Sequence, residues 1–529
     1  MTRGNKGFRN LPKLERVKRG RPAPSRPASP RRSAREPRRE REAPRASLAL
    51  DQCPEPLRAA LLALSDALAT VPDVWVVGGA VRGIVSGSPH AGDLDLALPS
   101  GAILMGRALA DGIGGAFVLL DTERGAARVV TGEGGGISQI DLTDFRAPSI
   151  EEDLRRRDFT VNALAVSLHG LVRDGRAVVI NPTGGLEDLA RGRLRMAGPA
   201  SLSEDPVRAL RGVRLAFERG FSIEPATRAA IRQVAPRLAE AAPERLREEW
   251  VALLSLGRSA AALRALDLLG LLTVILPEAE AMRGVTQPRP HRFTVWEHSL
   301  RTVEAVELLL PRLDALDPFG AELERHLAEP LGDGCTRGEA LKLAALLHDA
   351  AKPQTRSISD GQIRFIGHDK LGAEMAEAAC RRWRLAGRAS RVIERLVRHH
   401  LRPMHLAQAG EVTRRARYRF FRDLESEAQD LLLLTLADAA AARGISPLRI
   451  WRGPGGALVR DLMRGWEDDR AMAAAPPLLR GEDVMEAFGL GPGPEVGRLL
   501  ALAREAHALG RVGSREEALA FLAEMVRIG

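Results

Sequence analysis

The character of the sequence changes near residue 200, and this change limits the folds open to the chain. Before it, short apolar runs such as DVWVVGG, FVLLD, ARVVT and ISQIDLT alternate with helix-like segments, which predicts a small mixed sheet. After it, stretches such as ALRALDLLGLL and EALKLAALLHDAAK are rich in Ala, Leu and Arg and have helical periodicity. We therefore expect an α+β protein in which a small mixed-sheet head precedes an extended all-α body.

The basic charge of the chain is concentrated at its start. Residues 1–50 hold 16 Lys or Arg and 4 Glu, a balance of +12, so the net charge of +10 leaves about −2 for the rest of the 529 residues. This segment is rich in Pro and Arg and has almost no apolar periodicity, so we predict a disordered basic tail. Such a tail either attracts RNA phosphates or is a solvated extension.

The chain is too long for one hydrophobic core, and we place the head at residues 51–200.

Cysteine usage and hydropathy indicate the compartment. Cys53, Cys335 and Cys380 are isolated and show no paired spacing, which is typical of a reducing compartment, and we expect the cytoplasm. The sequence contains no run of 18 apolar residues, so we predict no membrane span. We also expect neither a secretory signal nor a membrane partner.

Two aspartates in GDLDLALP, Asp93 and Asp95, lie one residue apart in an apolar run. Because side chains alternate across a strand, both carboxylates lie on one face and the leucines between and after them lie on the other. Upstream, Gly78 and Gly79 form a strand-to-helix turn whose amides can hold an anion, and Arg82 can reach the same phosphate. Carboxylates near a phosphate site predict Mg²⁺ bound against a triphosphate, whereas the alternative is a solvent-facing strand edge.

Further polar residues in this region extend the candidate site. Two-metal phosphoryl chemistry usually needs a third carboxylate, and we favour Asp141 in QIDLTDFR over its competitor Asp144. In DLRRRDFTVNALAV, Arg157 and Asp158 are placed to contact ribose hydroxyls and phosphates, and Asn162 lies in a predicted apolar strand. The alternative for this segment is an internal network of salt bridges.

Taken together, four linked motifs resemble the class II tRNA nucleotidyltransferase and bacterial poly(A) polymerase family. They are GGAVRG, GDLDLALP, RRRDFTVNALAV and EDPVRALRGVRLAFERGF. PERLREEW is similar to a later helical motif of that family, and the resemblance runs from about residue 55 through an HD domain to RGEDVMEAFGLGPGPEVGRLL. Gly83 and Asn181 depart from the family, which commonly has Asp at the first position and often at the second.

The resemblance implies roles for individual residues. Asp93 and Asp95 would bind the catalytic Mg²⁺ ions, and Asp205 with Arg208 would read the nucleobase. Spacings of three residues predict that Asp205, Arg208 and the next two arginines follow one side of a helix, for which an intrahelical ion-pair ladder is the alternative. The full set of nucleotide-binding residues implied is Gly78, Gly79, Arg82, Arg157, Asp158, Asn162, Asp205, Arg208, Arg211 and Arg214.

Histidines are concentrated in the helical region, where eight of the 11 fall between residues 291 and 405. One set of residues resembles the H…HD…D ligands of HD phosphohydrolases and suits a divalent transition metal such as Mn²⁺, Co²⁺ or Ni²⁺. This set comprises His298, His348, Asp349 and Asp438. His368 and the pair His399–His400 are candidates to supply a second metal or to bind phosphate.

As a whole, the resemblance implies a CCA tRNA nucleotidyltransferase that adds CMP, AMP or both, from CTP and ATP, to the 3′ end of tRNA without a template. The alternatives are a bacterial poly(A) polymerase, an HD phosphohydrolase with an RNA-binding head, and an RNA-binding scaffold. The resemblance also divides the helical body into a neck with RNA-binding and nucleobase-selection functions (201–282), an HD metal-binding domain (283–445) and a C-terminal helical domain (446–529). The oligomeric state is not constrained by these features.

Overall fold

The structure is a computed structural model that describes residues 46–87, 93–131, 137–410, 412–466 and 476–528. Most of the predicted basic tail, up to residue 45, therefore lies outside the described residues. The end of that segment is part of the head, because β1 (Ser47–Ala49) pairs antiparallel with β8 (Arg176–Val178) and Leu48 is buried. The head thus begins before the expected boundary at residue 51.

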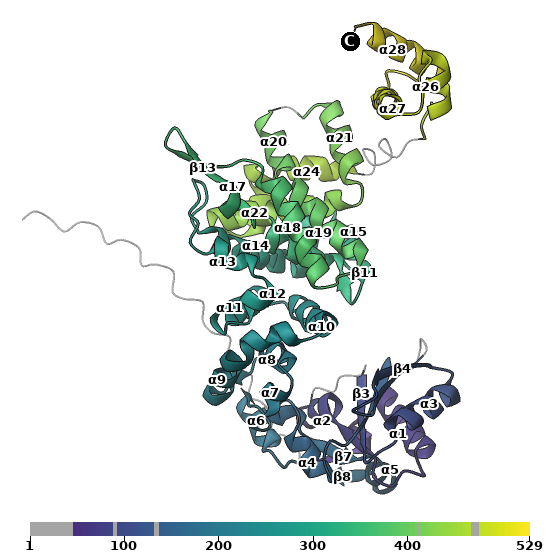
Figure 1. Cartoon of the computed structure of the whole chain (residues 1–529), viewed down its shortest axis with the longest axis vertical. Coiled ribbons are helices and arrows are strands. Elements are labelled where there is room, and N and C mark those ends of the chain that lie inside the picture. Colours follow the sequence, from purple (N-terminus) through teal and green to yellow (C-terminus); the bar gives the residue numbers. More distant parts are fainter. Residues whose placement is uncertain (1–45, 88–92, 132–136, 411, 467–475, 529) are drawn as a thin grey trace, which may run out of the picture. The chain divides into compact units, whose positions relative to one another are not determined.

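The head is built on a six-stranded mixed sheet in which all the predicted strand runs take part (Figure 1). Its spatial order is β4–β5–β6–β3–β2–β7. The central strand β3 carries the two aspartates and pairs antiparallel with β2 and parallel with β6. Leu94 and Leu96 on its other face are fully buried, as the alternation predicts. The strands are β2 (Trp75–Val77), β3 (Asp93–Leu98), β4 (Ala116–Asp121), β5 (Ala126–Val130), β6 (Gln139–Asp144) and β7 (Ala165–Ser167).

Helices connect and cover these strands. In α1, Leu57, Leu61 and Leu64 recur at helical spacing and are buried in the core of the head. The helices of the head are α1 (Glu55–Ala67), α2 (Gly78–Val85), α3 (Ala102–Ile113), α4 (Ile150–Arg155), α5 (Leu168–Asp174) and α6 (Gly185–Arg191), and a short strand β9 (Arg193–Leu194) follows them.

One expected strand of the head is wrong in its extent. Asn162 lies in a single 3₁₀ turn, Thr160–Asn162, and the strand begins only at Ala165. The physical reason is local hydrogen bonding: the Asn162 amide nitrogen Nδ2 donates to Asp158 Oδ1 at 3.0 Å, and the Asn162 backbone N–H donates to the Phe159 carbonyl at 2.9 Å. Such side-chain and turn bonds compete with strand pairing.

The rest of the chain is helical, as predicted, apart from two short hairpins and the short strand β10, which pairs parallel with β9. The neck contains α7 (Ser201–Glu204), α8 (Val207–Arg219), β10 (Ser222–Ile223), α9 (Pro225–Val234), α10 (Pro243–Leu254), α11 (Ser259–Leu268), α12 (Leu272–Ile275) and α13 (Glu278–Met282). The following region contains α14 (Val295–Leu309), α15 (Gly320–Leu327), β11 (Pro330–Gly332), β12 (Cys335–Thr336), α16 (Arg337–Leu347), α17 (Lys352–Thr355), β13 (Arg356–Ser359), β14 (Gln362–Phe365), α18 (His368–Arg382), α19 (Gly387–His399), α20 (Arg402–Gln408), α21 (Arg414–Leu424) and α22 (Glu427–Arg443). The last helices are α23 (Pro447–Arg452), α24 (Ala457–Arg464), α26 (Gly481–Phe488), α27 (Pro494–Ala508) and α28 (Arg515–Ile528).

Asp205 does not share a helix with the arginines that follow it, contrary to the expectation. It has extended backbone angles, φ −150° and ψ 96°, and α8 begins only at Val207. The reason is Pro206, because the ring of a proline disfavours the helical conformation for the residue before it. Arg208, and with it the two further arginines of the motif, lies on α8 as predicted.

One continuous hydrophobic core runs through the head, the neck and the histidine-rich region. It includes Ile450 and Trp451 of α23 and Leu462 of α24, so these helices do not belong to a separate C-terminal core as the boundary at residue 446 implied. A second core is formed by α26, α27 and α28. Among the described residues, no helix combines the length and the apolar character needed to cross a membrane.

Candidate active site and metal-ligand cluster

A cavity of about 580 Å³ lies where the sheet of the head meets the first helices of the neck. It is lined by every predicted nucleotide-site residue except Asp205. The predicted residues that line it are Gly78, Gly79, Arg82, Asp93, Asp95, Asp141, Arg157, Asp158, Asn162, Arg208, Arg211 and Arg214. Residues more than 100 positions apart in the chain therefore share one surface.

Three carboxylates gather on neighbouring strands at this cavity. Asp93 and Asp95 lie on β3, and Asp141 is the direct partner of Asp95 in the parallel register of β6. Burial raises the pKa of Asp95, and the negative charges of Asp141 and Asp93 raise it further, although the nearby Arg157 opposes them. A bound cation would relieve this clustering of negative charge, and carboxylate oxygens are the ligands that Mg²⁺ prefers.

The two candidates for the third carboxylate have different partners. Asp141 is held by both ends of the Arg128 guanidinium, with Nε donating to Oδ1 at 2.7 Å and Nη2 donating to Oδ2 at 2.9 Å. Asp144 Oδ1 instead accepts a hydrogen bond of 2.8 Å from the backbone N–H of Ala102, the first residue of α3. Both carboxylates line the cavity, where Asp141 is bound by Arg128 and Asp144 accepts from the first amide of α3.

The glycine turn between β2 and α2 brings the backbone against the carboxylates. Gly78 has φ +68°, and a Cβ atom there would lie 2.9 Å from Asp95 Oδ2, so the turn requires glycine. Its own N–H donates to the Leu164 carbonyl, which leaves Gly79 and Ala80 as the first amides of α2 at the cavity. Arg82, one turn into the helix, is buried and donates to Asn162 Oδ1.

Asp158 links this turn to the neck helix α8. Its carboxylate accepts from Asn162 Nδ2 and lies 3.5 Å from Arg211 Nη1. Burial alone would raise the pKa of Asp158, but the charges of Arg211 and Arg208, with these hydrogen bonds, lower it below its ordinary value. The carboxylate is therefore ionised and forms an ion pair with Arg211 of α8.

Glu249 on α10 is a residue to which the sequence assigned no role. Its Oε1 accepts from Arg211 Nε at 2.6 Å, and its Oε2 accepts from Arg214 Nε at 2.7 Å. Because Glu249 is only 6% exposed, it fixes both guanidinium groups from a buried position. The only sequence signal for it was its place in PERLREEW, together with the excess of arginine on the facing helix.

Arg208 and Asp205, the pair expected to read the nucleobase, are both hydrogen-bonded to other groups of the protein. Arg208 Nη1 donates to the carbonyls of Arg156 and Ser201 at 3.0 and 2.9 Å. Asp205 accepts a 2.5 Å hydrogen bond from Arg245 of α10. Arg208 lines the cavity, whereas Asp205 is not among its lining residues.

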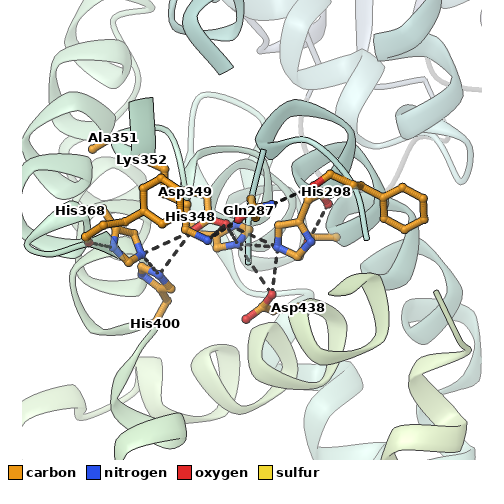
Figure 2. Close-up of polar contacts among 12 residues, drawn as sticks. Gln287, His298, His348, Asp349, Ala351, Lys352, His368, His400 and Asp438 are labelled. Atoms are coloured by element: carbon orange, nitrogen blue, oxygen red, sulfur yellow. Dashed lines mark hydrogen bonds and ion pairs between the residues drawn. The ribbon is translucent and has the colours of Figure 1, made fainter. Parts of the chain in front are cut away.

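The histidine-rich region forms a buried cluster in which two groups of ligand atoms lie side by side (Figure 2). Within each group, all ligand atoms lie within 4.8 Å of one another. Asp349 was expected with the first group and also contacts it, since its Oδ2 lies 3.5 Å from His298 Nε2 and 3.2 Å from His348 Nε2. The two groups are His298, His348 and Asp438, and Asp349, His368 and His400.

Five helices deliver these side chains. His298 lies on α14, Asp438 lies on the almost entirely buried helix α22, and His348 follows the last residue of α16. His368 is the first residue of α18, and His400 directly follows α19. In Figure 2, His348 and Asp349 lie between His298 on one side and His368 and His400 on the other, so the predicted HD dipeptide is at the centre of the cluster.

The charges within the cluster are coupled. Burial lowers the pKa of His348, but Asp349 and Asp438 raise it above its ordinary value, so a metal bound there would displace a proton. Burial opposes ionisation of Asp349, but the charges of His348 and Lys352 hold the pKa of that carboxyl well below its usual range. Burial lowers the pKa of His400 to about 3, which keeps this imidazole neutral at pH 7. Ionised carboxylates and neutral imidazoles are the forms that coordinate metals.

Family models match three consecutive parts of the chain. Residues 74–195 match the poly A polymerase head domain, residues 220–282 match the probable RNA and SrmB-binding site of polymerase A, and residues 295–443 match the HD domain. These ranges include the carboxylates and the glycine turn of the cavity and the whole histidine cluster, whereas the arginines of α8 lie between the first two ranges.

Known proteins resemble the chain over most of its length. The A-adding tRNA nucleotidyltransferase of Deinococcus radiodurans is 39% identical over 460 residues, which is 85% of this chain and 95% of the relative. The CC-adding tRNA nucleotidyltransferase of Thermus thermophilus is 36% identical over 86% of this chain and 94% of the relative. The solved CCA-adding enzyme of Bacillus stearothermophilus in complex with CTP is 25% identical, with a TM-score of 0.57 over 90% of this chain and 98% of that chain. The chain therefore belongs to the tRNA nucleotidyltransferase family, with the head domain of the poly(A) polymerases.

Proposed function

We propose that this chain adds CMP, AMP or both, from CTP and ATP, to the 3′ end of tRNA without a template. The observation that supports this most directly is the single cavity that joins the Asp93 and Asp95 carboxylates to the glycine turn and to the arginines of α8. Such a cavity combines carboxylates that can hold a metal ion with guanidinium groups that can hold a triphosphate.

In the proposed reaction, the 3′-hydroxyl of the tRNA attacks the α-phosphate in line and pyrophosphate leaves. Asp93 and Asp95 would hold Mg²⁺, which supplies a lower pKa for the attacking hydroxyl and charge neutralisation for the leaving group. Asp141 is the third carboxylate, kept in place by Arg128. We assign no catalytic role to Asp144, since it caps α3.

Nucleotide binding is proposed for the groups around the carboxylates. The amide of Gly79 and the guanidinium of Arg82 bind the triphosphate, with Arg157 beside them. Arg157 is held at 3.3 Å by Asp153, which orients it along the cavity. Asp158 and Asn162 hold the sugar side of the nucleotide and connect it to α8.

Base selection is proposed for the arginines of α8 with Asp205. Arg208 offers donors at the cavity, and Arg211 and Arg214 add contacts to phosphate and base. For Asp205 to contact the base, its carboxylate has to break its ion pair with Arg245 and bind the nucleotide instead. Buried hydrogen-bonding groups penalise a base that leaves them unpaired, which permits selection without a template.

The decisive experiment offers CTP and ATP singly and together to tRNA that ends before CCA and to tRNA that ends in CC. Products are separated at single-nucleotide resolution. Addition that stops at the CCA end supports the proposal, and the substrate that is extended identifies CC, A or CCA addition. Long A tails on varied RNAs without incorporation of C would contradict it and favour a poly(A) polymerase.

For the histidine cluster, we propose a divalent transition metal, Mn²⁺, Co²⁺ or Ni²⁺, bound by His298, His348, Asp349 and Asp438. The support is that His298 Nε2 lies within 3.5 Å of ligand atoms from each of the other three residues. Imidazole and carboxylate donors in this mixture suit such ions.

We also propose a cytoplasmic location, which fits the three cysteines of the chain, all of them free and buried.

A further inference from the structure

A second cavity of the head, of about 490 Å³, adjoins the nucleotide cavity, and the proposed reaction gives it no role. Asp144 and Arg146 line both cavities. Asp144 lies three residues after Asp141 on β6, so the second cavity begins about 10 Å along the strand from the proposed third carboxylate. An RNA strand whose end lies at the carboxylates can therefore extend into this cavity.

Contacts to Asp144 fix the walls of the second cavity. Asp144 Oδ1 accepts from the N–H of Ala102 at the start of α3, and the Asp144 backbone N–H donates to the Gly125 carbonyl at 3.0 Å. Gly125 ends the turn between β4 and β5 with φ +58°, and a Cβ atom there would overlap Asp144 Oδ2. α3 also packs on β4 and β5 (Figure 1). The helix, the turn and the end of β6 therefore shape the cavity before a ligand enters.

Arg146 presents a guanidinium group where the two cavities meet. Its backbone is held on both sides, because its N–H donates to Asp153 Oδ1 at 3.0 Å and its carbonyl accepts from Arg156 Nη1 at 2.9 Å. Within the described part of the chain, no hydrogen bond or ion pair engages its side chain, although an arginine has five N–H donors. The fixed backbone thus places an unpaired cation between the cavities.

Arg124 adds a second positive charge at the β4–β5 turn. Its Nε lies 3.6 Å from Asp121 Oδ2, which leaves its other N–H groups for a ligand. Burial lowers the pKa of Arg146, and the charge of Asp153 opposes this effect. The charges of Arg157 and Arg124 lower that pKa further. An anion between the guanidinium groups would remove this repulsion, and phosphate oxygens accept strongly from arginine.

Apolar and aromatic side chains make up much of the remaining lining. Pro99, Ile103, Leu104 and Phe145 line the cavity, and Leu104 is 70% exposed. An unpaired nucleobase can cover such a surface, because its faces stack on aromatic rings and pack on apolar groups. Glu123 also lines the cavity and is exposed, so it opposes an anion from that side. Arginines beside aromatic and apolar surface are typical of sites for single-stranded RNA.

We propose that this cavity binds the unpaired RNA strand directly behind its 3′ end. Arg146 and Arg124 hold one phosphate of the strand, and Leu104 and Phe145 contact a base. The inference rests on the proposed function, because the strand is placed by its 3′-hydroxyl in the nucleotide cavity. A free nucleoside triphosphate offers the same chemical groups, but its higher charge requires a metal ion, and the carboxylate of Asp144 is already engaged with α3.

The test measures binding of tRNA acceptors to the full chain without CTP or ATP, so that no nucleotide is added. One acceptor ends before CCA, a second ends in CC, and a third lacks every unpaired nucleotide at its 3′ end. We expect Arg146→Gln to weaken binding of the acceptor that ends in CC about tenfold at low salt and to leave the third acceptor unchanged. The slope of log Kd against log salt concentration should fall by about 0.7 for the lost phosphate contact.

Charge variants separate a phosphate contact from a general disturbance of the head. Arg146→Lys should restore most of the slope, and Arg124→Gln should weaken binding of the same acceptor. Glu123→Gln removes the opposing charge and should strengthen binding. Arg176→Gln is the matched control, since it makes the same change at an exposed position of β8 that lines neither cavity, and it should alter neither the slope nor the affinity.

Two results would overturn the strand site: an equal loss of affinity for all three acceptors after Arg146→Gln, or no loss for any of them. A raised KM for CTP and ATP with unchanged acceptor binding would also contradict it and assign the cavity to a free nucleotide. If no acceptor is extended, but Arg146→Gln still weakens only those with an unpaired end, the proposed function fails and this site stands. Extension of tRNA by a chain in which Arg146→Gln has no effect on binding gives the reverse result.

Discussion

The buried carboxylate of Glu249 offers the sharpest test of how the nucleotide cavity is held together. Its two oxygens accept from Arg211 and Arg214, and both arginines line the cavity. Glu249→Gln keeps the shape of the side chain but replaces one oxygen with an NH₂ group. That group would face an arginine N–H, so one charge-assisted hydrogen bond is lost and two donors oppose each other.

The magnitude follows from the exposure of the partners. Hydrogen bonds to charged groups contribute about 1.5–3 kcal/mol each. The side chains of Arg211 and Arg214 are 37% and 20% exposed, so water compensates part of the loss. We therefore expect a decrease of about 2 kcal/mol in the free energy of unfolding. If the arginines lose their orientation, we also expect the KM for the nucleotide to rise about tenfold, which corresponds to about 1.4 kcal/mol.

Two measurements are needed, urea unfolding and steady-state kinetics with CTP and ATP on a tRNA acceptor. Glu248→Gln is the matched control, since it makes the same change at the neighbouring, exposed position of the same helix. Glu249→Asp should recover part of the KM effect because it restores the charge. An unchanged KM alongside the loss of stability would refute the reasoning, because Glu249 would then support the fold without positioning the arginines.

Three further predictions concern the head and the neck helix α8. Asp93→Asn combined with Asp95→Asn should abolish nucleotide incorporation while tRNA binding in a gel-shift assay persists, because we propose that these carboxylates hold Mg²⁺ and not the RNA. Gly212→Ala should lower stability by about 1–3 kcal/mol in thermal unfolding, since its Cβ atom would lie 2.6 Å from the Phe159 ring. Asp158 has a lowered pKa in the folded protein, so its ionised form stabilises the fold above about pH 4, the pKa of an unfolded aspartate. The stability advantage of the wild type over Asp158→Asn should therefore be present at pH 7 and shrink as the pH falls below 4.

Local patterns predicted the strands and their faces because they depend on nearest neighbours. Alternation alone placed Asp93 and Asp95 opposite the buried Leu94 and Leu96, and the structure confirms this. Asp205 shows the limit of spacing arguments. Its three-residue interval to Arg208 fits a helix, but Pro206 excludes its backbone from one, a signal that was present in the sequence and outweighed the spacing.

Contacts between distant segments could not be predicted in this way. Glu249 meets Arg211 across 38 residues, and Arg128 meets Asp141 through the pairing of β5 and β6. An acidic residue on an amphipathic helix is normally solvated, so nothing in its neighbourhood distinguishes Glu249 from Glu248. The distinction arises only when α8 and α10 pack together, because packing decides which carboxylate is removed from water.

The histidine cluster could be predicted in part from local sequence patterns, and the rest of it depends on contacts between distant segments. The adjacent pair His348–Asp349 was recognisable because its order with His298 and Asp438 resembles the H…HD…D ligand set of HD phosphohydrolases. The second group was also partly encoded: two helices of 15 and 13 residues, joined by a short turn, must run antiparallel. This topology brings the start of the first, His368, to the end of the second, His400. Only the position of Asp349 at that end depends on the packing of α16 against α19, and that contact brings its carboxylate within 4.8 Å of the ligand atoms of the two histidines.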